Sequence, residues 1–245
     1  MAYTADVDLE FLSKCSNDDL ATLFEILTQD KKGSRRLTEG LTKNEKVMAN
    51  RPNHTAYWDL IAGELQKFGA NTFISVLRGG GVEYKEILKD VCNKMKVNYN
   101  SSSDTKIIEM NLLLKVLTDS VEKMSPEELK ILVKDLDLKT TKYSKQAIIA
   151  GLQASVNLSG FMAYRLSVVV ANAVAKAVVG RGLSFAANAG LTRVIGVFAG
   201  PIGWGITSLW TLVDIAGPAY RVTMPAVIQV AYMRVKLSNI SSQSA

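Results

Sequence analysis

One run of twenty residues without a formal charge, residues 194–213 (VIGVFAGPIGWGITSLWTLV), limits the possible folds of this chain more than any other feature. Twenty helical residues at about 1.5 Å per residue would cover the roughly 30 Å hydrocarbon core of a bilayer. The run is interrupted by Gly200, Pro201, Gly203 and Gly205, and a proline inside a helix costs about 3 kcal/mol. The sequence therefore predicts a glycine-rich hairpin of two shorter helices rather than one transmembrane span.

Small residues allow helices to approach closely both in water-soluble proteins and in membranes. The sequence therefore supports two interpretations of the hairpin about equally: it packs against the rest of the protein, or it associates with a membrane. A conventional span is disfavoured, because Arg165, Lys176 and Arg193 would each cost about 2.5–3.5 kcal/mol at the centre of a bilayer. The residues that we expect to contact a membrane or a partner are Phe198, Trp204, Trp210 and Arg181.

Charge is distributed unevenly along the chain. Residues 1–150 carry 22 basic and 22 acidic side chains, whereas the last third has seven basic residues and one acid, which accounts for the whole net charge of +6. Proteins that bind nucleic acid cluster their cations on a solvated face, but here the excess cations are spaced singly through apolar sequence. An anionic membrane surface is therefore favoured over nucleic acid as a partner, and residues 1–150 are expected to form a neutral, soluble helical fragment.

The single acid of the last third is Asp214. A buried carboxylate without a counter-charge is costly, so Asp214 is expected to pair with Arg221 or Arg193. The Gly217-Pro218 turn would bring Arg221 back toward it. Arg193 lies at the other end of the uncharged run and would reach Asp214 only if the hairpin closes.

The remaining sequence predicts helices. Ser16 and Ser125 are typical N-caps, and Ser125 is followed by a proline and two acids. Residues 107–117 are apolar over too wide a stripe for a surface helix, and residues 223–236 form another expected helix, with Pro225 in its first turn. Because no alternating strand pattern occurs, we predict an all-α, multi-helix bundle with an apolar, glycine-rich C-terminal hairpin.

Residues needed for common catalytic and metal sites are scarce. His54 is the only histidine and is expected on the surface of a polar loop, while Cys15 and Cys92 are isolated, as in a reducing compartment. Three acids are expected on solvated helix faces: Glu109, Asp119 and Glu122. The sequence therefore predicts no enzyme, no metal and no cofactor. Because the start lacks a basic cluster and an apolar run, we expect a cytoplasmic protein, either free or peripheral on the inner membrane.

Three blocks of sequence, residues 6–41, 58–91 and 217–234, together resemble the uncharacterised bacterial YaaW-like family over nearly the full length. Members of that family are similar in their middle region to the ubiquinol-cytochrome c chaperone domain and have a short N-terminal domain of unknown function. The resemblance and the composition together divide the chain into three segments: a short N-terminal helical domain (1–36), a helical domain resembling the chaperone domain (37–150) and an apolar cationic helical region (151–245).

Two functions of different classes follow from these observations. The first is a non-enzymatic helical interaction protein, like a chaperone or assembly factor, whose partner is a protein client or an anionic membrane surface. The alternative is a membrane-inserting effector that perturbs a bilayer through its C-terminal hairpin. The family resemblance names no site residues that would decide between them.

Overall fold

The computed structural model describes residues 3–30, 32–36, 39–70, 82–136, 138, 140, 142–158, 160–183, 217 and 219–243. In this part of the chain the protein contains helices, short 3-10 turns and no β-strand, which confirms the predicted all-α class. The predicted hairpin falls in residues 184–216, outside the described part. The elements are η1 (Glu10–Lys14), α1 (Asn17–Thr28), η2 (Leu41–Lys43), α2 (Glu45–Asn50), η3 (His54–Tyr57), α3 (Trp58–Ala70), α4 (Tyr84–Lys94), α5 (Thr105–Val121), α6 (Pro126–Asp135), α7 (Lys145–Leu158), α8 (Gly160–Val179) and α11 (Tyr220–Gln243).

Two predicted helix starts are confirmed. The Ser16 hydroxyl accepts a hydrogen bond from the Asp19 backbone N–H (3.3 Å) at the start of α1. At the start of α6 the Ser125 hydroxyl accepts from the Glu128 N–H (3.3 Å), and the Glu128 carboxylate accepts from the Ser125 N–H (2.7 Å). These side chains satisfy N–H groups that have no partner within the helix, so both helices begin where the sequence places them.

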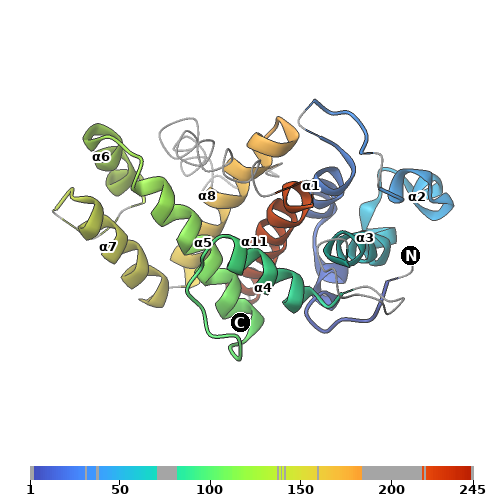
Figure 1. The fold of residues 1–245 in the computed structure, drawn as a ribbon, viewed down its shortest axis with the longest axis horizontal. Coiled ribbons are helices and arrows are strands. Elements are labelled where there is room, and N and C mark those ends of the chain that lie inside the picture. Colours follow the sequence, from blue (N-terminus) through green and yellow to red (C-terminus); the bar gives the residue numbers. More distant parts are fainter. Residues whose placement is uncertain are drawn as a thin grey trace.

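The centre of the molecule is α11. It contacts α8, α1, α5, α4 and α3, and Figure 1 shows it in red between α1, α3 and α4 on one side and α5, α7 and α8 on the other. The helix is longer at both ends than the predicted 223–236, and Pro225 lies inside it rather than in its first turn. A proline inside a helix removes one backbone hydrogen bond. Burial of the side chains from Val222 to Met233 on all sides offsets that loss.

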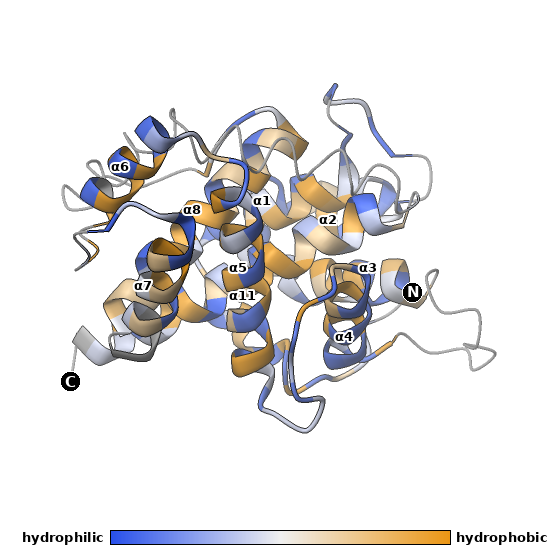
Figure 2. Ribbon diagram, turned by 60° about the vertical axis from the view of Figure 1, so that its left-hand side comes forward, coloured by the Kyte–Doolittle hydropathy of each residue, from blue (hydrophilic) through white to orange (hydrophobic). Residues whose placement is uncertain are grey.

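The hydrophobic residues are distributed in keeping with this arrangement of helices around α11. In Figure 2 hydrophobic residues gather on the helices that face the middle of the molecule, while α4 and α6 carry hydrophilic residues on their outward sides. The buried core includes side chains from η1 through α11, among them Leu23, Ile61, Leu88, Leu112 and Val227. Because α11 packs on elements from each of the three sequence segments, one apolar core serves all of them. The division at residues 36 and 150 stays a prediction.

A glycine sets the distance between α3 and α4. A Cβ atom added at Gly69 would lie 2.5 Å from both Cγ1 and Cδ1 of Ile87, closer than any real carbon contact. Any larger residue at position 69 would therefore force α3 and α4 apart or push Ile87 out of its position in the core.

Candidate binding groove

A buried charge network joins α5 to α11. The Glu109 side chain is entirely buried; its Oε2 accepts from Arg234 Nε (2.7 Å) and its Oε1 from the Tyr84 hydroxyl (2.7 Å). Arg234 also donates from Nη2 to the backbone carbonyl of Asp8 (2.7 Å) and lies over the Phe11 ring, with its guanidinium carbon 4.2 Å from the ring centroid. The prediction that Glu109 lies on a solvated face is therefore wrong: its helix is apolar on this side too, and its counter-charge comes from α11.

Burial and ion pairing have opposite effects on the pKa of the Glu109 carboxyl. Burial raises the pKa of the Glu109 carboxyl, and the adjacent Arg234 guanidinium opposes the rise without cancelling it. The pKa of Tyr84 is raised by burial first and by the Glu109 carboxylate second. The three side chains therefore depend on one another, because loss of any one would leave a buried polar group without its partner.

Two further ion pairs connect the cationic end of the chain to α1. The Lys236 ammonium lies 2.7 Å from Asp19 Oδ2, with the Asp19 side chain only 6% exposed. Arg181, which follows α8, pairs with Glu25. Together with Arg234, these are three of the seven cations of the last third, and each is paired with an acid from residues 1–150. At least three of the seven cations of the last third are therefore neutralised by ion pairs within the protein.

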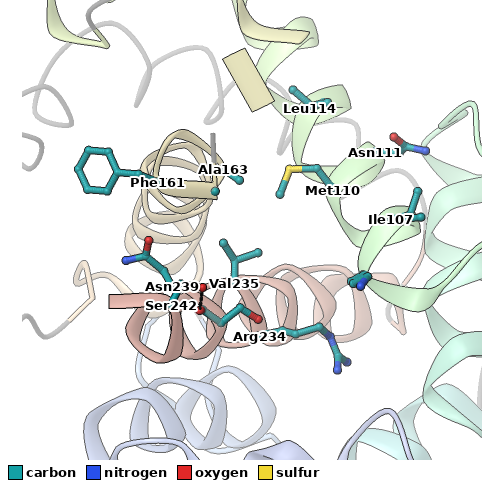
Figure 3. A pocket seen from close by; sticks show the side chains of 13 residues that line it. Ile107, Met110, Asn111, Leu114, Phe161, Ala163, Arg234, Val235, Asn239 and Ser242 are labelled. Carbon is teal, nitrogen blue, oxygen red and sulfur yellow. Dashed lines mark hydrogen bonds between the residues drawn. The ribbon is translucent and has the colours of Figure 1, made fainter. Parts of the chain in front are cut away.

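Beside this network lies a groove of about 600 Å³ between α5, α8 and α11. Figure 3 shows Ile107, Met110 and Leu114 of α5 on one side, Phe161 and Ala163 of α8 on another, and Val235, Asn239 and Ser242 of α11 along the floor. The other lining residues are Lys106, Asn111, Gly160, Arg234 and Ser238. Three helices thus form the walls of a mostly apolar groove, and its polar groups come largely from the last turns of α11.

The rim of the groove carries two exposed apolar side chains. Ile107 is 47% exposed and Phe161 is 53% exposed. Single exposed apolar residues are ordinary, but two that flank one cavity form a local apolar surface of the kind that partners bind. Ile131 on α6 is equally exposed (46%) but does not line the groove, so it serves as a comparison residue.

A polar hollow of about 590 Å³ adjoins the groove on the other side of Arg234. Its charged lining residues are Asp6, Asp8, Glu83, Lys85, Asp104, Lys106 and Arg234. The Asp6 carboxylate accepts from the Tyr84 backbone N–H (2.7 Å), and that of Asp8 accepts from the Thr105 hydroxyl (2.7 Å). These two acids are therefore already engaged in holding the N-terminal segment onto α4 and α5.

The groups considered for catalysis or metal binding do not assemble into a site. In the described residues no three His, Cys, Asp or Glu side chains are placed to hold a metal ion. Cys15 and Cys92 are buried, and burial raises the pKa of each thiol to about 12. His54 is half-buried, with its ring 5.2 Å from that of Phe24, which corrects its expected surface position.

Most of the predicted contact residues cannot be placed. Asp214, Arg193, Phe198, Trp204 and Trp210 lie outside the described residues, so the Asp214 ion pair stays a prediction. The two that are described are an exposed Arg221, at the start of α11, and Arg181, in its pair with Glu25.

One described helix, α8, is long and apolar enough to cross a membrane. In the fold 72% of its most apolar window is buried against other helices. Length and composition alone would also select the core helix of a water-soluble protein, and α8 has such a position here, between α5, α7 and α11.

The fold and the groove define a class of protein: it is all-α, it is built around a buried helix, and an apolar groove lies beside that helix. Residues 53–228 match the family model described as ubiquinol-cytochrome C chaperone, and residues 3–37 match a domain of unknown function, DUF3944. The chain is 48% identical over 237 residues to a UPF0174 protein of Helicobacter pylori (strain J99), covering 96% of this chain and 94% of the relative. It is 32% identical over 241 residues to the UPF0174 protein YaaW of Escherichia coli (strain K12), covering 96% and 97%.

The chain belongs to the UPF0174 family, which confirms the resemblance found in the sequence. The match to the chaperone family covers α3 to the first part of α11 and extends well past residue 150. It indicates a role of the chaperone or assembly-factor type, and these family descriptions name no catalytic activity. No solved structure matches the chain.

Proposed function

We propose that this protein is a non-enzymatic, chaperone- or assembly-factor-like protein that holds an apolar helical segment of a client protein in the groove between α5, α8 and α11. The observation that carries the proposal is the apolar groove with Ile107 and Phe161 exposed at its rim. Exposing them to water is unfavourable unless a partner covers them, since full burial of such a side chain is worth about 1.5–3 kcal/mol.

A helix suits the walls of this groove. The apolar lining residues of α5 are spaced at Ile107, Met110 and Leu114, which places them along one face of that helix. An amphipathic helix laid between α5 and α8 would extend the packing of helix on helix that builds the rest of the molecule. Met110 adds a flexible side chain that can fit clients of different sequence.

The family supports a protein client. The matched model describes a chaperone, and its residues 53–228 include the α5 and α8 walls of the groove. The membrane-inserting alternative depends on residues 194–213, which lie outside the described part of the chain. We therefore place the site of client binding on the described groove and leave the hairpin out of the proposal.

The test uses a fluorescein-labelled amphipathic helical peptide with leucine and alanine on one face, titrated with the full-length protein and followed by fluorescence anisotropy. We expect saturable binding, and Ile107→Gln should weaken it about three- to tenfold, because roughly half of a side chain's burial energy is lost. Ile131→Gln is the matched control: it makes the same change at the same exposure on α6, and binding should be unchanged.

Two results would contradict the proposal. One is the absence of any saturable binding by the wild-type protein. The other is an equal loss of affinity in Ile107→Gln and Ile131→Gln, which would mean that the peptide adheres to exposed apolar side chains wherever they occur.

A further inference from the structure

The charged side chains that line the groove all carry positive charge. Of its thirteen lining residues only Lys106 and Arg234 are charged, and both are cationic. The neighbouring polar hollow, by contrast, is lined by charges of both signs. An occupant of the groove therefore meets positive charge at the Lys106 end and no acidic side chain along its lining.

The two cations differ in what they can offer to a partner. Arg234 is held by the buried Glu109 carboxylate and by the Asp8 carbonyl, and only 18% of its side chain is exposed. Figure 3 shows its guanidinium directed away from Phe161 and Ala163. Its charge is therefore already balanced inside the protein.

Lys106 is different. It is exposed in the first turn of α5 and forms neither an ion pair nor a side-chain hydrogen bond with any residue in the described part of the chain. Asp104, the N-cap residue of α5, lines the polar hollow together with Lys106 but forms no ion pair with it. The exposed Asp104 carboxylate at the N-cap offsets the partial positive charge of the α5 N-terminus, so Lys106 itself is the cation of the groove that is available to a partner.

We propose that the client segment carries an acidic side chain at the end that lies over Lys106, and that Lys106 thereby sets the direction in which the segment lies in the groove. The inference rests on the proposed function, since it names the partner's chemistry for the same site. Apolar contact with Ile107, Met110 and Phe161 supplies the affinity without fixing direction. A single charge at one end distinguishes the two orientations and the clients that fit.

The experiment compares two labelled peptides with the same apolar helix, one ending in two glutamates and the other in two lysines at the same positions. We expect the wild-type protein to bind the acidic peptide about three- to fivefold more tightly at low salt, as for one exposed ion pair. Lys106→Glu should reverse the preference. Lys130→Glu, which makes the same change of net charge on α6, should leave it intact. High salt should remove the preference while keeping the binding.

The outcomes separate the inference from the function on which it rests. Equal affinity for both peptides, or a preference reversed equally by Lys130→Glu, overturns the role of Lys106 while the groove still binds apolar helices. Loss of all peptide binding overturns the proposed function. A membrane partner is tested with vesicles containing phosphatidylglycerol: if they displace the acidic peptide from the wild type but not from Lys106→Glu, the anionic partner is a lipid surface and the protein-client assignment is wrong.

Discussion

The two ends of α11 meet the rest of the molecule in different ways. From Val222 to Met233 the helix is buried mainly against apolar side chains of α1, α3, α4, α5 and α8, and Gln229 Nε2 donates to the backbone carbonyl of Asp19 (3.2 Å). From Arg234 onward it is held by charge: Arg234 to Glu109 of α5, and Lys236 to Asp19 of α1. Apolar contact scales with buried area and has little directionality, whereas a buried ion pair requires particular atoms at particular distances. The first end of α11 therefore supplies stability, and the second end fixes its position.

The difference between the two ends of α11 is tested most strongly by removing the Arg234 side chain. Arg234→Ala leaves the Glu109 carboxylate without its partner in the core, and should lower the free energy of unfolding by about 3–5 kcal/mol. Urea unfolding measures this. Lys89→Ala, which breaks the exposed pair with Glu86 on α4, is the control and should cost less than about 1 kcal/mol.

A double replacement tells positioning from stability. Apolar residues of similar volume can replace a buried ion pair at little cost, so Glu109→Leu combined with Arg234→Met should recover part of the stability that Arg234→Ala loses. The recovery should be incomplete, because the buried Tyr84 hydroxyl loses its Glu109 acceptor. If the charges fix the position of α11, this double variant should still show weaker peptide binding in the groove. If the double variant binds the peptide as tightly as the wild type does, the ion pair does not fix the position of α11.

Lys236→Met should have an intermediate effect. It keeps the aliphatic stem but leaves the nearly buried Asp19 carboxylate with neutral hydroxyl donors, those of Ser16 (2.6 Å) and Tyr232, in place of its counter-charge. Because the lysine side chain is 24% exposed, solvent screens the pair, and we expect a loss of about 1–2 kcal/mol. The difference from wild type should shrink as sodium chloride is raised to about 1 M; a loss independent of salt would show that packing of the stem dominates.

Ile228→Val probes the apolar end of α11. Ile228 is 1% exposed, and removal of one methylene from a packed core costs about 0.5–1.5 kcal/mol. This loss should not change with salt, which is the property that distinguishes it from Lys236→Met. Parallel urea titrations at low and high salt compare the two variants directly.

The smallest effect concerns a charge away from α11. Burial lowers the pKa of His54 below its ordinary value of 6.5, so the folded state binds this proton less readily than the unfolded state. Its contribution to stability is therefore complete above about pH 6.5 and is lost as the pH falls below it. His54→Phe should show a weaker fall in stability between neutral and mildly acidic pH, measured by thermal melts; an unchanged fall would assign the pH dependence to another group.

The helix starts could be predicted from sequence because their causes are local. The caps at Ser16 and Ser125 depend on side chains within three residues. The width of the apolar stripe at residues 107–117 also carried information: α5 is buried on one side and lines the groove on the other. Sequence alone did not separate Ile107, exposed at the rim, from Ile108, buried in the core, because both are isoleucines in the same run.

The charge network could not be predicted by the same reasoning. Glu109 and Arg234 are 125 positions apart, and periodicity reports only which residues share a face of one helix. One signal was present: Glu109 is a single acid within an apolar run, IIEMNLLLKVL, where a solvated face is implausible. An acid so placed requires a buried counter-charge, and the cationic last third was the region able to supply it.

The central position of α11 has a consequence for how the protein is made. A ribosome adds residues at about 5–20 per second, so Glu109 leaves it well before Arg234, and Asp19 earlier still before Lys236. During that interval α1, α3, α4, α5 and α8 lack the helix on which they all pack, and the Glu109 and Asp19 carboxylates lack their counter-charges. The complete core therefore forms only after α11 has emerged from the ribosome.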